Sequence, residues 1–171
     1  MTQILLINGS PLHPSRSAVL LEKIERIAKA KQWSATKLVV RELDANALLA
    51  ADSSHPSIQK ALQAIESAEA IVAVTPTYKA AYSGILKALL DLVPHNGFAG
   101  KKVLPFMLGA TPLHALALDF SFKPLFMALG ASFIAPGAFL LDDRFQKNEG
   151  QYGLSDELQA HVTRLFESFT A

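Results

Sequence analysis

The chain has 171 residues, the size of one ordinary domain, which leaves no room for two full ones. Half of the residues are hydrophobic and 18% are charged, against roughly 25% in typical soluble proteins, so a core is easily built and some apolar surface remains to be covered. A formal net charge of +1 gives no support to binding of nucleic acid or an anionic membrane. The lack of cysteine excludes disulfides, thiolate nucleophiles and cysteine-ligated metals.

No targeting or membrane-spanning segment is expected. Met1-Thr2-Gln3 lacks the basic start of a signal peptide. The longest apolar stretch, 103–118, is interrupted by two prolines and a histidine and is short of a membrane span. We therefore expect a cytoplasmic protein with one domain over residues 1–171, assembled as a homodimer or homotetramer.

Apolar runs and segments of helical periodicity alternate along the chain. In chain order they predict strand 4–7, helix 17–31, strand 37–43, loop 48–56, helix 57–67, strand 71–74, helix 84–92, strand 103–108, helix 113–130, strand 133–140 and helix 155–168. This alternation implies right-handed crossovers and a parallel sheet. Five such units fit a flavodoxin-like α/β fold, with strand order 2-1-3-4-5 and helices on both faces, better than the six-stranded dinucleotide fold.

Ligands of such sheets bind beyond the carboxyl ends of the strands, which directs attention to the loops 9–17, 75–84 and 109–114. The first loop places three serines and an arginine directly before a helix. A helix start offers free N–H groups and partial positive charge, which together favour a phosphate. The alternative is that Ser15 or Ser17 merely caps the helix. Capping needs only one hydroxyl, so we favour the phosphate.

The second loop, 75–84, places two tyrosines around small residues. Small side chains let a flat ring approach the backbone and bond to its amides, although a rigid surface loop with half-buried tyrosines has the same composition. The third loop says little on its own. In the following helix, Pro124 deprives the Phe120 carbonyl of its partner. Either a π-bulge, which is frequent at functional sites, or an ordinary proline kink would result.

The motifs in these loops resemble the NADPH-dependent FMN reductase family. They are Gly-Ser-Pro…Ser-Arg-Ser at 9–17, Thr-Pro-Thr-Tyr-Lys-Ala-Ala-Tyr-Ser-Gly-Ile-Leu-Lys-Ala-Leu-Leu-Asp at 75–91, Gly-Ala-Thr at 109–111 and His-Ala-Leu-Ala-Leu-Asp-Phe-Ser-Phe-Lys-Pro at 114–124. The likeness covers 4–140 and is greatest to flavin reductase components of two-component alkanesulfonate monooxygenases. The stretch 75–91 is the most specific part.

The resemblance implies an NAD(P)H-dependent FMN reductase that uses FMN with NADPH or NADH and supplies reduced flavin to a monooxygenase. It implies that three groups of residues bind FMN: Ser10, Ser15, Arg16 and Ser17 at the phosphate; Pro76, Thr77, Tyr78 and Lys79, with Ser83 nearby, at the isoalloxazine edge; and Gly109, Ala110 and Thr111 at the other side of the ring. Three residues depart from the family pattern. Leu12 replaces the usual arginine, Ala110 a second glycine, and Phe120 a tyrosine in a helix with a π-type insertion.

No catalytic acid, base or nucleophile and no metal are expected. Hydride transfer from nicotinamide to flavin belongs to the cofactors, and the five histidines show no metal-ligand spacing. We expect backbone amides of 77–79 to stabilise negative charge on the reduced flavin. The rival functions are an FMN-bound quinone or azo-compound reductase, a flavodoxin-like electron carrier, and a binding module without redox activity.

Overall fold

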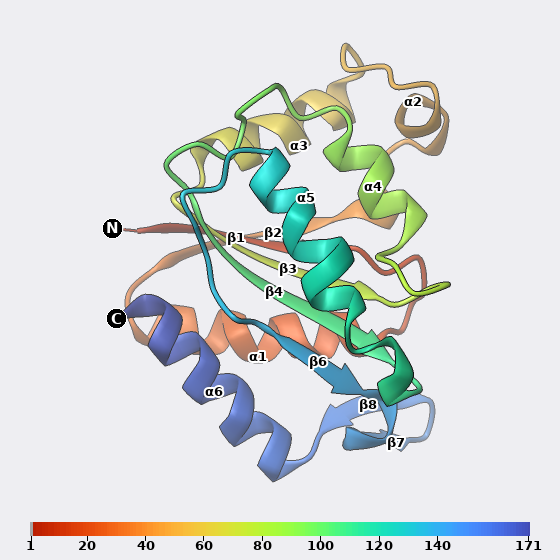
Figure 1. The fold of residues 1–171 in the computed structure, drawn as a ribbon, viewed down its shortest axis with the longest axis vertical. Helices are drawn as coiled ribbons and strands as arrows, with labels where there is room; N and C mark the ends of the chain where they lie inside the picture. Colours follow the sequence, from red (N-terminus) through yellow and green to blue (C-terminus); the bar gives the residue numbers. More distant parts are fainter. Residues whose placement is uncertain (1) are drawn as a thin grey trace.

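A computed structural model describes residues 2–171, in which a parallel sheet lies between two layers of helices (Figure 1). The sheet contains six strands: β1 (Gln3–Asn8), β2 (Ser34–Val39), β3 (Ala70–Pro76), β4 (Lys102–Gly109), β5 (Phe133–Ile134) and β6 (Ala138–Leu141). The order is β2-β1-β3-β4-β5, with β6 also pairing with β4, and every pair is parallel. The flavodoxin-like fold and its strand order are therefore confirmed.

Helices cover both faces of the sheet. They are α1 (Arg16–Ala30), α2 (Ala45–Leu49), α3 (Pro56–Ser67), α4 (Gly84–Leu90), α5 (Lys123–Ala128) and α6 (Asp156–Thr170), with a π-helix at Leu118–Phe122 and 3₁₀ turns at Val40–Glu42, Pro112–His114 and Asp142–Arg144. Within residues 2–171, no helix has both the length and the apolar character needed to cross a membrane. In the same part of the chain, no group of three or more histidine, cysteine, aspartate or glutamate residues is placed to hold a metal ion.

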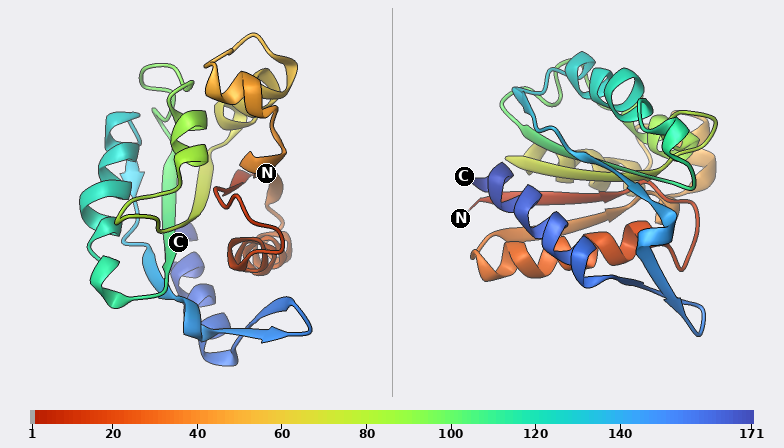
Figure 2. Two further views of the ribbon diagram at one scale, coloured as in Figure 1. Left: turned by 90° about the vertical axis from the view of Figure 1, so that its right-hand side faces the viewer. Right: turned by 60° about the horizontal axis from the view of Figure 1, so that its bottom comes forward.

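The central strands are continuous apolar runs because side chains from both of their faces are buried. One core contains Leu20 and Ile24 of α1 and Phe166 of α6, packed against one face of the sheet. The other core is built by α2, α3, α4 and α5 on the opposite face. Figure 2 shows α1 and α6 on one side of the sheet and α5 on the other. With both faces covered, the edge formed by the carboxyl ends of the strands remains for a site.

The prediction for the edge strand β2 is wrong, and the prediction for the loop that follows is right only in part. The strand spans 34–39 rather than 37–43, and its register with β1 begins at the pair Gln3 and Ser34. Residues 50–55 form the predicted loop and residue 56 begins α3, but residues 48 and 49 end the short helix α2. The N–H of Ala47 donates to the Asp44 carboxylate at 2.8 Å, which caps this short helix.

The fifth predicted strand is divided in two. Gly137 adopts φ +68° between β5 and β6, a left-handed conformation that breaks the extended run predicted over 133–140. A two-stranded antiparallel hairpin, β7 (Phe145–Asn148) with β8 (Gln151–Leu154), then follows, and it was not predicted. The hairpin lies at the end of the sheet toward which the strand arrows point (Figure 1).

The predicted helix 113–130 is interrupted by the π-helix Leu118–Phe122. The N–H of Lys123 donates to the carbonyl of Leu118, five residues earlier, which is the spacing of a π-helix. Pro124 follows in the first turn of α5, where its missing N–H costs least. Of the two alternatives left open by the sequence, the structure therefore has the π-helical one.

Substitution of Gly137 by alanine is expected to destabilise the protein strongly. A Cβ at this position would lie 2.1 Å from the carbonyl oxygen of Pro105, so the β4–β6 pairing would have to shift. We expect Gly137→Ala to cost at least about 3 kcal/mol of unfolding free energy, measured by urea denaturation. Gly150→Ala is the matched control, because its φ is also positive but no atom lies within 4 Å of the added carbon. Similar losses in both variants would contradict the close contact.

Candidate functional site

A cavity of about 270 Å³ lies beyond the carboxyl ends of β1, β3 and β4. We call it the strand-end cavity. It is lined by residues of all three predicted loops, by one residue of β4 and by two from the C-terminal part of the chain: Ser10, Leu12, Pro14, Ser15, Arg16, Ser17, Pro76, Thr77, Tyr78, Leu108, Gly109, Ala110, Asp142 and Tyr152. The topology brings the loops together, because parallel strands end at the same edge of the sheet.

Most of the predicted site residues share this cavity. The lining includes Ser10, Ser15, Arg16, Ser17, Pro76, Thr77, Tyr78, Gly109 and Ala110. Three predicted residues do not line it, namely Lys79, Ser83 and Thr111. Their contact with a flavin stays a prediction that the shape of the cavity does not favour.

The first loop presents its serines at the start of α1. Ser10 Oγ accepts a hydrogen bond from the Leu12 amide, and Ser15 Oγ accepts one from the Ala18 amide, both at 3.2 Å. Ser15 is thus the helix cap that the sequence offered as an alternative. A hydroxyl that accepts one bond still has its own proton to donate. Because α1 begins at Arg16, the amides of Arg16 and Ser17 also have no partner within the helix.

Two buried polar atoms of the cavity lining have no hydrogen-bond partner. They are Nε of Arg16 and Oγ1 of Thr77. An unsatisfied buried polar group costs about 1–3 kcal/mol, so such groups call for an explanation. The two atoms come from different loops that meet at one cavity. A ligand with hydrogen-bonding groups at two separate places, such as the phosphate and ring of FMN, fits this donor set.

Arg16 contacts the C-terminal part of the chain. Its Nη1 lies 3.5 Å from Oδ2 of Asp142, and its guanidinium carbon lies 4.7 Å from the centre of the Tyr152 ring. Neither partner was predicted from the sequence. Gly150 marks the turn of the β7–β8 hairpin, but Glu149-Gly150 is a weaker hairpin signal than Asn-Gly or Asp-Gly. No local pattern, however, indicates that Tyr152 would fold back onto the first loop.

The second loop contains a two-residue turn. The N–H of Tyr78 donates to Ala81 O at 2.9 Å, and the N–H of Ala81 donates to Tyr78 O at 3.1 Å. Between them, Lys79 and Ala80 adopt φ of 51° and 60°, which is uncommon for residues other than glycine. The amide of Thr77 donates to Leu108 O at 2.7 Å. The amides of Thr77 and Tyr78 are therefore occupied, contrary to expectation, and those of Lys79 and Ala80 are the ones with no bond within the turn.

Ser83 joins the first two loops instead of lining the cavity. Its hydroxyl donates to the Gly9 carbonyl at 2.5 Å and accepts from the Leu86 amide at 3.3 Å, so it also caps α4. Its own amide donates to Oγ1 of Thr75 at 2.9 Å. Ser83 thereby fixes the start of α4 against the end of β1.

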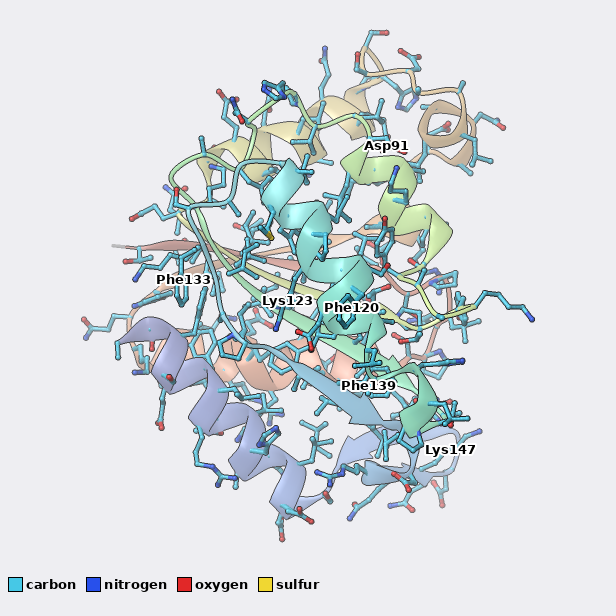
Figure 3. All side chains as sticks on the ribbon, viewed as in Figure 1. Asp91, Phe120, Lys123, Phe133, Phe139 and Lys147 are labelled. Atoms are coloured by element: carbon cyan, nitrogen blue, oxygen red, sulfur yellow. The ribbon has the colours of Figure 1, made fainter. Side chains whose placement is uncertain are left out.

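The remaining predicted residues belong to the third loop. Gly109 lies against Phe139, labelled in Figure 3, and a Cβ on Gly109 would lie 2.6 Å from that ring. Glycine is therefore required here by the packing of β6. Thr111 Oγ1 accepts from the Leu113 amide at 3.3 Å and caps the 3₁₀ turn. Thr111 has a structural role that needs no flavin.

We expect Ser83→Ala to destabilise the protein by about 2–3 kcal/mol, because the buried Gly9 carbonyl loses its donor and α4 loses its cap. Ser155→Ala is the matched control. Ser155 caps α6 through a single bond from the Leu158 amide, so its loss is expected to cost about 1 kcal/mol. Urea unfolding of both variants measures the difference. Equal costs would show that the bond between the two loops contributes little.

Comparison with known proteins shows the family of this chain. The family described as NADPH-dependent FMN reductase matches residues 2–146. An FMN reductase (NADPH) from Escherichia coli (strain K12) is 33% identical over 98% of this chain and 87% of its own length. A second FMN reductase (NADPH), from Pseudomonas putida, is 37% identical over 86% of this chain and 75% of its own length.

The fold comparison agrees with the family. A crystal structure described as NADH:FMN oxidoreductase (EmoB), apo form, superposes with a TM-score of 0.88 at 29% identity. The alignment covers 99% of this chain and 88% of the other. The family match, the relatives and the fold coincide with the resemblance found in the loop motifs. The chain belongs to the NADPH-dependent FMN reductase family.

Proposed function

We propose that this chain reduces FMN with NADPH or NADH and that FMN binds in the strand-end cavity. Family membership supports the reaction, and one observation supports the place. The lining contains two buried polar atoms without a hydrogen-bond partner, Nε of Arg16 and Oγ1 of Thr77. They belong to two different loops, and the family resemblance assigns the phosphate to one loop and the ring edge to the other. A single molecule with a phosphate at one end and a polar ring edge at the other can satisfy both.

The phosphate end is assigned to the first loop. Buried Ser10, Ser15 and Ser17 surround the start of α1, and Arg16 adds the positive charge. The helix start contributes free amides and the positive end of its dipole. These groups are held before any ligand arrives, because Ser10 and Ser15 are oriented by the bonds they accept.

The ring end is assigned to the second and third loops. Gly109 and Ala110 present little side chain, and Thr77 has an unpaired hydroxyl. Tyr78 is 44% exposed, so an apolar face of its own ring is accessible beside the opening of the cavity. When bound, FMN would accept the hydride that the nicotinamide coenzyme supplies, which is chemistry of the cofactors themselves. The part of the chain is to orient the flavin and to exclude water from one of its faces.

We also propose that the reduced flavin is passed to a flavin-dependent monooxygenase in the cytoplasm. The likeness of the 75–91 motif to monooxygenase-linked reductases supports this partner. The cavity also opens at exposed side chains, with Leu12 60% accessible at its rim. A nicotinamide coenzyme is a reductant of the cell interior, which supports the location. Release of reduced flavin can be followed anaerobically by filtration of protein mixed with FMN and NADPH.

Arg16→Ala is expected to weaken FMN binding by about 10- to 100-fold, since a charge-assisted hydrogen bond is worth roughly 1.5–3 kcal/mol. Titration monitored by flavin fluorescence measures the dissociation constant. Arg26→Ala is the matched control, because Arg26 lies exposed on the same helix and its Nε donates only to the Glu22 carbonyl. Unchanged FMN affinity in Arg16→Ala would refute the phosphate site. Steady NADPH oxidation with FMN separates a reductase from a flavodoxin-like electron carrier.

The chain is further proposed to assemble as a homodimer or homotetramer through the helical segment after β4. Leu118, Phe122 and Phe126 of this segment are buried, whereas its exposed face carries apolar side chains beside one ion pair, between Asp119 and Lys123. That face carries Leu113, Leu116, Phe120 and Met127, each between 66% and 87% accessible. Phe120 can be followed in Figure 3. Several large apolar side chains exposed on one short segment are typical of a protein interface.

We expect Phe120→Glu to convert the oligomer to monomer in sedimentation experiments, since a charge would be buried at the apolar interface. Leu49→Glu is the control, because Leu49 is equally apolar and 79% exposed but lies on α2, away from this segment. It is expected to leave the assembly unchanged. A wild-type protein that sediments as a monomer at micromolar concentration would overturn the proposed assembly.

A further inference from the structure

The strand-end cavity has no net formal charge. Among its lining residues only Arg16 and Asp142 carry a formal charge, and these charges cancel. Leu12 at the rim adds none. A phosphate monoester carries about −1.5 to −2 charges at neutral pH, so the phosphate of FMN enters a lining that is neutral overall.

The Arg16–Asp142 contact is loose. Nη1 and Oδ2 are 3.5 Å apart, longer than the 2.7–2.9 Å of a charge-assisted hydrogen bond. Both side chains are partly accessible, at 32% and 29%. Nε of the same guanidinium has no partner at all. The arginine is thus free to bond a second anion while Asp142 remains beside it.

Arg16 does not depend on Asp142 for its position. Its guanidinium also lies over the ring of Tyr152 at 4.7 Å, a cation–π contact from the β7–β8 hairpin. The stem of Arg16 begins in the first turn of α1, which Ser15 caps. Two anchors remain if the carboxylate is removed, so the main effect of Asp142 on a bound phosphate is electrostatic.

We infer that Asp142 is a specificity-determining residue that weakens the binding of phosphorylated flavin and keeps FMN exchangeable. The carboxylate competes with the phosphate for Arg16 and repels it through the shared cavity. This inference rests on the proposed binding of FMN in the strand-end cavity. It accounts for how a site with three hydroxyls, an arginine and a helix start can release its ligand, as a donor of reduced flavin must.

The test measures dissociation constants of FMN and of riboflavin, the same ring without phosphate, for the wild type and for Asp142→Asn. We expect Asp142→Asn to bind FMN about three- to tenfold more tightly, with a matching fall in its dissociation rate. Its affinity for riboflavin is expected to be unchanged, so the riboflavin-to-FMN ratio of dissociation constants rises. A purely structural role of Asp142 would alter both ligands alike.

Asp143→Asn is the matched control. Asp143 is the neighbouring residue, is exposed and is not part of the lining, so its neutralisation changes the net charge equally. We expect its ratio of the two constants to equal that of the wild type. The pair Arg16→Ala and Arg16→Ala/Asp142→Asn supplies a second comparison. Direct repulsion requires Asp142→Asn to tighten FMN binding in that background as well.

Three results would overturn the inference. They are an unchanged ratio in Asp142→Asn, weaker FMN binding in that variant, and an equal gain in Asp143→Asn. If Asp142→Asn weakens FMN binding in the wild type but not in the Arg16→Ala background, Asp142 only positions the arginine. If neither the wild type nor Asp142→Asn binds FMN better than riboflavin, the phosphate site fails, and the proposed place of FMN fails with it. A wild type that prefers FMN, combined with an unaltered Asp142→Asn, leaves the proposed function standing and removes only the role of Asp142.

Discussion

The hydrogen bond from Ser83 to the Gly9 carbonyl is the contact on which the geometry of the site depends. The parallel ladder ends at Asn8 and Val74 between β1 and β3, and beyond it the chains would diverge. The Gly9 amide extends the pairing by one bond, to Val74 O at 2.8 Å, and the Ser83 hydroxyl then holds the Gly9 carbonyl. The donors of the first loop are thereby fixed against the second loop without help from a ligand, which is the preorganisation that a binding site needs.

The second loop combines this rigid base with a strained tip. Lys79 and Ala80 are both left-handed, a conformation that costs roughly 1–2 kcal/mol per residue when the residue is not glycine. Glycine or asparagine at these positions would relieve the strain. The turn nevertheless leaves the amides of Lys79 and Ala80 without a hydrogen bond inside it. Strained backbone of this kind clusters at functional sites, and here it lies beside Thr77, whose hydroxyl is buried without a partner.

Local sequence was sufficient for the parts of the fold that are buried on both faces. β1, β3 and β4 are apolar throughout, and their ends defined the loops that meet at the cavity. Prediction failed where tertiary contacts decide the structure. The edge strand β2 takes its register from β1, and the left-handed Gly137, which packs closely against the Pro105 carbonyl, breaks an apolar run. Asp142 and Tyr152 reach the site only through the hairpin, so their part in it is a property of the fold.

The same limit applies to the helical segment after β4, whose sequence is apolar almost all round. Composition alone does not say which face of an apolar helix meets the sheet. The π-helix Leu118–Phe122 inserts an extra residue, which changes the side that the following residues present. Phe122 and Phe126 pack into the core, while Phe120 is 78% exposed. Because this segment follows directly on Gly109 and Ala110 of the cavity lining, a subunit docked on its exposed face would stand next to the strand-end cavity. Assembly and flavin binding are therefore expected to influence each other through the third loop.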